Sequence, residues 1–189
     1  IACGVAAAVG MAFSSQTALS GFSQAVEFLK GRATHTIKRP AGPMDENILT
    51  RIMRDPAVEA FSPVIDRRVR LPEGELIRLL GVDPFLDRAV RPAFARVSFT
   101  ERGSLKDALS FLLDDKSIFM GARLAGKLNL HPGDEVKTSR GTFHIISTFP
   151  NPSGEPLIFM DIAKAQEIFS LRGEVDYVDL ILKDPKEFR

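Results

Sequence analysis

The sequence predicts an α+β fold in which two split β-α-β units share one sheet and a small β-rich module is inserted between them. Residues 33–84 read as strand, helix, strand and strand, and residues 157–184 read as strand, helix and strand. Between these two units, short apolar stretches alternate with tight Pro-Gly and Arg-Gly turns. Such turns are typical of a compact β-rich module.

The first unit begins with a strand over residues 33–40, followed by a helix over residues 43–54. Pro43 suits a first helical turn, and the Asp55-Pro56 step ends the helix. The apolar positions of this helix are Met44, Ile48, Leu49, Ile52 and Met53.

Two further strands complete the first unit. Residues 63–72 alternate, with Ile65, Val69 and Leu71 on one face. Residues 75–84 are more apolar, which indicates a more buried hairpin partner. The basic residues of the alternating strand could be interpreted as a phosphate or lipid-headgroup site, but we interpret them as a solvated strand face; they are Arg67, Arg68 and Arg70.

The inserted module begins with a helix whose Ser104 and Asp107 have capping-box spacing. A short strand over residues 116–121 and a short helix over residues 122–130 follow. Residues 131–149 then form a hairpin with its turn near residues 139–141.

The closing unit has clear boundary signals. Asp161 is placed to cap a helix that follows the strand over residues 157–161, and Gly173 supplies the stop. In the last strand, residues 175–184, the side chains of Val178, Leu180 and Leu182 share one face.

The chain opens with thirteen uncharged residues, Ile1 to Phe13. A helix of that length covers about 20 Å of the roughly 30 Å of a bilayer's hydrocarbon core. The segment could be a signal-peptide core, a lipoprotein start at Cys3, a plain buried helix, or the outer half of a transmembrane helix. The absence of a preceding basic stretch argues against a signal, and the apolar residues after Cys3 argue against a lipid tether, so we favour the transmembrane helix.

The following pattern supports a stalk. Leu19, Phe22, Val26 and Leu29 lie at alternating spacings of three and four, which places them on one stripe of a helix. Gly31 follows as a stop signal. We expect a helix that runs outward from the membrane and uses this stripe as an interface with a partner helix, although the same stripe could also face the domain core.

Several function classes find no support in the residues. The formal net charge of +1 gives no field that would attract nucleic acid, and the chain lacks glycine-rich phosphate-binding loops. Its single cysteine excludes an internal disulfide. The three histidines are isolated from acidic ligands at helical spacing, so no metal site is expected; they are His35, His131 and His144. Asp114 and Asp115 suit a solvated turn better than an acid–base pair. We therefore expect no catalytic residue and no cofactor.

Three stretches together resemble the extracytoplasmic domain of MacB/FtsX-type ABC transporter permeases. "ELIRLLGVDP" resembles the family's strand that ends in a Gly-Val-Asp-Pro corner, here residues 81–84. "FMGARLAGKLNLHPGDEV" resembles its helix followed by Leu-x-Leu-x-x-Gly-Asp, which ends here at Gly133 and Asp134. "IFMDIAKAQEIFSLRGEVDYVDLIL" resembles its closing strand, helix and strand.

The resemblance implies a domain organisation. Residues 1–31 would be the outer end of transmembrane helix 1 and the stalk helix. Residues 32–84 and 156–189 would form a porter-like α+β subdomain, and residues 85–155 an inserted β-rich, Sabre-like subdomain.

The resemblance also implies a function without catalysis. The domain would lie on the periplasmic side of the bacterial inner membrane and couple ATP-driven transmembrane motion to extrusion or release of a substrate, or to a partner protein. An ABC-type ATPase subunit, a second permease copy or homologue, and a periplasmic partner or a lipid, lipoprotein or peptide substrate would be its partners. The main alternative from the sequence is a secreted or lipid-anchored binding module with a processed signal segment, and a second is a hydrolase that uses Asp114 or His131.

Overall fold

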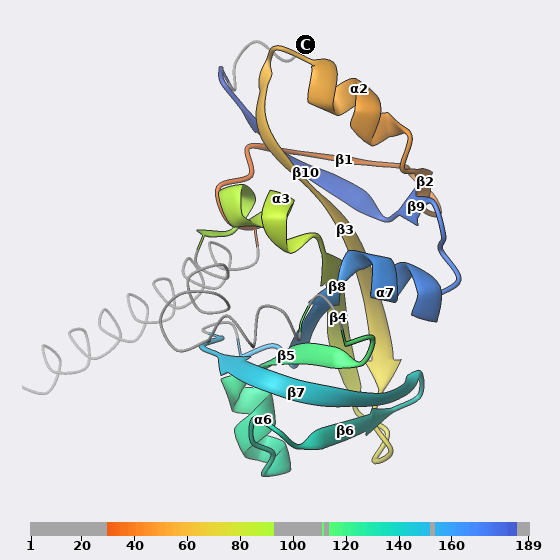
Figure 1. The fold of residues 1–189 in the computed structure, drawn as a ribbon, viewed down its shortest axis with the longest axis vertical. Coiled ribbons are helices and arrows are strands. Elements are labelled where there is room, and N and C mark those ends of the chain that lie inside the picture. The colour runs from red at the N-terminus through yellow and green to blue at the C-terminus, as the bar shows by residue number, and fades with distance from the viewer. Residues whose placement is uncertain (1–29, 93–110, 112–113, 152–153, 185–189) are drawn as a thin grey trace, which may run out of the picture.

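The computed structural model describes residues 30–92, 111, 114–151 and 154–184. An eight-stranded mixed sheet with strand order β1-β10-β3-β4-β8-β5-β7-β6 runs along the long axis of the molecule (Figure 1). Its strands are β1 (His35–Lys38), β3 (Val58–Arg70), β4 (Leu76–Val82), β5 (Ser117–Gly121), β6 (Glu135–Thr138), β7 (Gly141–Phe149), β8 (Leu157–Asp161) and β10 (Tyr177–Leu182). The short strands β2 (Met44–Asp45) and β9 (Glu174–Val175) form a separate ribbon. The helices are α2 (Ile48–Arg54), α3 (Pro84–Val90), α6 (Ala122–Leu128) and α7 (Ile162–Ile168).

The predicted α+β fold is confirmed, and the two split units share one sheet as expected. Strands β3 and β4 form an antiparallel pair, β4 then pairs in parallel with β8, and β10 pairs with the other edge of β3. Strands β5, β7 and β6 extend the same sheet through an antiparallel contact between β5 and β8. The division into porter-like and Sabre-like subdomains stays a prediction.

The register of β3 and β10 defines two buried faces of the sheet. Phe61 pairs with Leu180, and both lie in the core cluster that α2 covers through Ile52. The neighbouring pair, Ser62 and Asp179, projects to the opposite face because side chains alternate along a strand. That face is covered by α3, so this part of the sheet is buried on both sides.

The core continues from one predicted unit into the inserted segment. One cluster joins residues of β3 and β4 to residues of β5, α6, β6 and β7, among them Ile65, Leu79, Ile118 and Val136. Helix α7 packs against the same face at Gly81, where a Cβ atom would lie 2.4 Å from the Cβ of Ala165. Glycine is therefore required for this close approach.

The helix predicted over residues 43–54 is shorter than expected. Met44 and Asp45 pair with β9 as an extended strand, and the Asp45 carboxylate accepts a hydrogen bond from the Asn47 backbone N–H at 2.8 Å. This turn delays the start of the helix to Ile48. Met53, which was expected on the apolar stripe, is 68% exposed, because only the Ile52 side of α2 faces the core.

Helix α3 was not predicted. The Asp83 carboxylate accepts hydrogen bonds from the backbone N–H groups of Phe85 and Leu86, and Pro84 occupies the first turn. Asp-Pro at a strand end is a helix-start signal, but we had interpreted it only as a corner.

The other predicted elements agree more closely with the structure. The Asp161 cap before α7, the turn between β6 and β7, and the shared face of Val178, Leu180 and Leu182 are confirmed. Strand β3 begins at Val58, earlier than expected, because its first residues pair with the end of β10.

Candidate functional site at the N-terminal junction

The predicted stalk interface, formed by Leu19, Phe22, Val26 and Leu29, lies outside the described residues. The description starts at Lys30, and a turn at residues 31–32 leads into the domain. Within the described ranges, none of the helices has the length and apolar character that a membrane crossing requires.

The two ends of the described chain lie side by side. Strand β1 pairs antiparallel with β10, so the start of β1 lies next to the end of β10. The Thr34 backbone N–H donates to the Leu180 carbonyl at 2.8 Å, and the Leu182 N–H donates to the Thr34 hydroxyl at 3.0 Å. The entering and leaving segments are therefore tied together at one corner of the sheet.

The entering segment is also fixed to α3. The Arg32 N–H donates to the Val90 carbonyl at 2.8 Å. Gly31 adopts a left-handed φ of 60°, and a Cβ at this position would lie 2.1 Å from the Val90 carbonyl oxygen. Only glycine fits both the backbone conformation and the contact.

A buried ion cluster lies directly behind this contact. The Arg91 guanidinium forms ion pairs with Asp87, one helical turn earlier, and with Asp179 on β10. The Ser62 hydroxyl donates to Asp87 Oδ1 at 2.6 Å, and the Thr36 hydroxyl donates to Asp179 Oδ1 at 2.6 Å. The cluster connects α3, β3, β10 and β1 beside the point where the chain enters.

Burial governs the electrostatics of the cluster. Burial raises the pKa of the Asp87 carboxyl, although Arg91 and Ser62 oppose the effect. The pKa of Asp179 is also raised by burial. Burial lowers the pKa of Arg91, but the two adjacent carboxylates outweigh it and raise that pKa overall. One guanidinium therefore faces two carboxylates in a site with almost no water access, and Asp87 Oδ2 has no hydrogen-bond partner in the described part of the chain.

Sequence reasoning missed this cluster. The spacing of Asp87 and Arg91 suits an i,i+4 ion pair, so a recognised α3 would have suggested half of it. The burial of Asp179 was not predicted, because the sequence pattern assigned only Val178, Leu180 and Leu182 to a shared face of this strand.

Two of the histidines, His131 and His144, have carboxylate neighbours. His131 is exposed in its turn, as expected. His144 on β7 contacts Asp114 Oδ2 through Nδ1 at 3.2 Å and Glu135 Oε1 through Nε2 at 2.9 Å. These hydrogen bonds raise the pKa of His144, that to Asp114 being the stronger cause. Among the residues described, no group of three or more His, Cys, Asp or Glu side chains is placed to hold a metal ion.

The basic residues of β3 and their neighbours are largely engaged. Arg67 pairs with Asp176 at 2.6 Å, and Arg70 donates to the Gly74 carbonyl at 2.7 Å. Arg78 on β4 binds Asp66 through two nitrogens, at 2.9 and 2.6 Å. These contacts engage Arg67 and Arg70, whereas Arg68 is exposed, in agreement with a solvated strand face.

Comparison with known proteins identifies the class of domain. The family profile of the MacB-like periplasmic core domain matches residues 1–188. An uncharacterised ABC transporter permease protein of Mycobacterium tuberculosis is 29% identical over 93% of this chain. The match spans only 21% of that relative's length.

Solved structures share the fold at low sequence identity. The extracellular domain of the noncanonical ABC-type transporter YknZ from Gram-positive bacteria superposes with a TM-score of 0.59 at 13% identity, covering 79% of this chain and 82% of that one. The periplasmic region of MacB from Actinobacillus actinomycetemcomitans gives 0.56 at 9% identity, covering 88% and 82%. This chain therefore belongs to the MacB-like periplasmic core domain family, the extracytoplasmic part of MacB-type ABC transporter permeases.

Proposed function

We propose that this domain transmits ATP-driven motion of the permease's membrane part to the extrusion or release of a substrate, or to a partner protein. The observation that carries the proposal is the junction, where the entering and leaving segments lie side by side and the entering one is hydrogen-bonded to α3 beside a buried ion cluster. A domain inserted between two transmembrane helices needs its two ends at one corner. A displacement of the segment that precedes β1 would be transmitted directly to α3 and to the sheet.

The proposed role needs no catalytic residue in this chain. ATP would be hydrolysed on an ABC-type ATPase subunit or domain, and the domain would lie on the periplasmic side of the bacterial inner membrane. Coupling requires two arrangements of the assembled permease with similar free energies, which nucleotide binding would exchange. The rigid sheet would carry the displacement from the junction to its other end, where β5, β6, β7 and α6 lie (Figure 1).

The coupling can be tested in the whole permease, assembled with its ATPase in lipid discs. A spin label is placed through Glu73→Cys, an exposed position in the turn between β3 and β4, in both copies. A nonhydrolysable ATP analogue should change the distance between the labels. Gly31→Val should reduce that change while ATP hydrolysis persists, because the side chain collides with Val90.

Gly42→Val is the matched control. Gly42 has a similar φ of 72°, but a Cβ atom there would meet nothing within 4 Å. This variant should keep the nucleotide-dependent distance change. If the distance between the labels in the parent permease were the same with and without nucleotide, the proposed coupling would be contradicted.

The stalk stripe is the proposed contact with a second permease copy or homologue. Cysteines at Phe22 and Val26 should cross-link between the copies in at least one nucleotide state. Gln24→Cys, which lies off the stripe at helical spacing, should cross-link much less. Failure of both stripe positions in every state would remove the stripe from the interface.

A further inference from the structure

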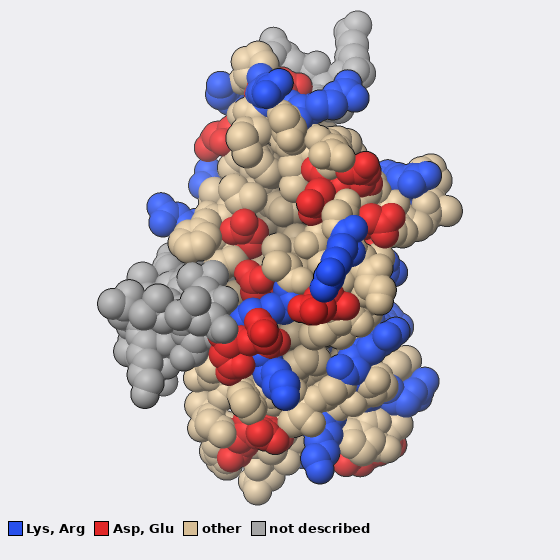
Figure 2. Space-filling model, turned by 45° about the vertical axis from the view of Figure 1, so that its right-hand side comes forward, with Lys and Arg blue, Asp and Glu red and all other residues tan. Residues whose placement is uncertain are grey.

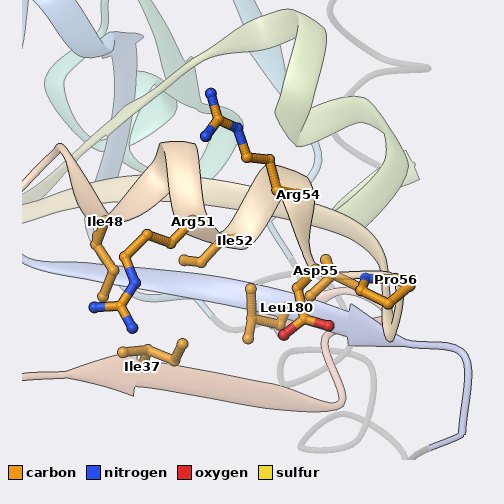
Figure 3. Close-up of a pocket in the computed structure, with 9 residues that line it drawn as sticks. Ile37, Ile48, Arg51, Ile52, Arg54, Asp55, Pro56 and Leu180 are labelled. Carbon is orange, nitrogen blue, oxygen red and sulfur yellow. The ribbon is translucent and has the colours of Figure 1, made fainter.

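A groove lies between α2 and the strands β1 and β10, away from the junction cluster. Two adjoining hollows of about 520 and 490 Å³ share Ile37, Ile48 and Arg51. Each hollow is an open depression in the surface rather than an enclosed cavity. Leu180 and Ile52 form a buried floor, and Ile37 and Ile48 are half-buried walls (Figure 3).

The groove carries a positive charge over this apolar floor that has no ion-pair partner among the described residues. The Arg51 side chain extends between α2 and β1 toward Ile37, whereas Arg54 points away from the groove (Figure 3). Neither guanidinium forms a hydrogen bond or ion pair with a described residue. Arg51 does not pair even with Asp55, four residues later, although that spacing permits a pair.

The rest of the rim carries two aspartates, each with one oxygen engaged in a turn, and a lysine. Asp55 Oδ1 already accepts a hydrogen bond from the Ala57 N–H at 2.9 Å, and Asp45 Oδ1 accepts one from the Asn47 N–H. Lys183 adds another positive charge at the Pro56 end, where its Nζ donates to the Pro56 carbonyl at 2.7 Å. Figure 2 likewise shows Lys and Arg side chains gathered at the end of the molecule that carries α2.

We propose that this groove binds an anionic amphiphile, with a single alkyl chain against Ile37, Ile52 and Leu180 and a phosphate or carboxylate head on Arg51. A guanidinium binds either head through charge-assisted hydrogen bonds. A peptide is the competing occupant, because β1 is an edge strand of the sheet and each rim carboxylate keeps a second oxygen, and the titrations below distinguish it from an amphiphile. The inference goes beyond the proposed coupling and does not depend on it.

The test is a calorimetric titration of the 189-residue chain with dodecyl phosphate below its micelle concentration. Dodecyl phosphate should bind, whereas butyl phosphate, with the same head, and dodecyltrimethylammonium, with the same tail, should not. Arg51→Gln should weaken binding at least about tenfold, and Arg51→Lys should restore part of it. Arg88→Gln, an exposed arginine on α3 beyond the sheet, is the matched control and should leave affinity unchanged.

The tail contact needs its own variant. Ile37→Ser should weaken binding about fivefold or more by removing apolar contact, with a thermal melt showing that the variant is folded. Dodecanoate and lysophosphatidylglycerol then distinguish a free fatty acid from a lysophospholipid, and preferential binding of either supports the assignment. An Arg51→Gln variant that binds as tightly as the parent overturns it, as does preference for an acidic apolar peptide. Because these titrations need no ATPase, their failure is distinct from a failure of coupling.

Discussion

The molecule contains two clusters of similar arrangement in opposite environments. In each, one basic side chain lies between two carboxylates: Arg91 between Asp87 and Asp179, and His144 between Asp114 and Glu135. All three members of the first cluster are at most 3% exposed. The side chains of the second are 42%, 39% and 56% exposed.

Burial decides what each cluster can do. In water, a pair of this kind is worth little, because solvent and salt screen it. In the interior, its charges must remain together, because removing one leaves the others desolvated and uncompensated. The first cluster therefore suits a fixed structural link at the junction, and we call Arg91, Asp87 and Asp179 the brace. The second cluster suits a group that titrates on the surface of the inserted segment.

Replacing Arg91 should give the largest effect. Arg91→Leu leaves two buried carboxylates without their cation, so we expect a loss of about 3–5 kcal/mol in the free energy of unfolding. Urea denaturation of the parent and the variant measures the difference. Arg88→Leu, on the same helix but exposed, should change stability by less than about 0.5 kcal/mol. Equal losses in the two variants would show that the buried cluster is no brace.

The next prediction concerns the contact between Gly31 and Val90, which lies next to the brace. Gly31→Ala and Gly42→Ala both place a side chain in the left-handed region, which costs about 1–2 kcal/mol. Only at position 31 does the new Cβ meet a backbone oxygen, that of Val90. Gly31→Ala should therefore lose about 1–2 kcal/mol more than Gly42→Ala in the same denaturation measurement. Equal losses in the free energy of unfolding would show that the backbone at the junction shifts to accommodate the new side chain.

The surface cluster should respond to pH instead. The pKa of His144 is raised above its ordinary value of 6.5, so the folded state holds this proton more tightly than the unfolded chain. The resulting stabilisation is fully present below about pH 6.5 and is lost as the pH rises through the folded pKa. NMR titration should place the pKa of His144 above 6.5, and Glu135→Gln should lower it.

A stability comparison provides the control for that titration. The parent should be more stable than His144→Gln at acidic pH by less than about 1 kcal/mol, and this difference should shrink as the pH rises. A difference that grows with pH would contradict the assigned direction.

The two clusters also show what the sequence could reveal. The β6–β7 hairpin was predicted with its turn near residues 139–141, and the resulting register places Glu135 opposite His144. Asp114 could not be added, because its approach depends on the parallel pairing of β5 with β7, which no local pattern fixes. Local sequence signals can therefore predict contacts made within a hairpin.

The brace could be predicted from the sequence less well than the surface cluster. Asp179 and Arg91 are separated by 88 positions, and their contact depends on which face of β10 the helix α3 covers. Alternation in the last strand predicted one buried face, which is correct for Val178 and Leu180. The burial of Asp179 on the other face follows from a helix that was itself overlooked. Long-range packing therefore decided the candidate site, whereas periodicity and caps decided most of the elements.

The smallest predicted difference between the two clusters is in their response to salt. Raising NaCl from about 0.05 to about 1 M shortens the screening length to about 3 Å, which weakens interactions among exposed charges. The pKa of His144 should then fall toward its ordinary value in the NMR titration. The stability loss of Arg91→Leu should stay constant within about 0.5 kcal/mol, because little solvent or salt reaches charges that are at most 3% exposed. If both quantities moved together with salt, the junction cluster would be accessible to water, and its role as a rigid link between the entering segment and the sheet would fail.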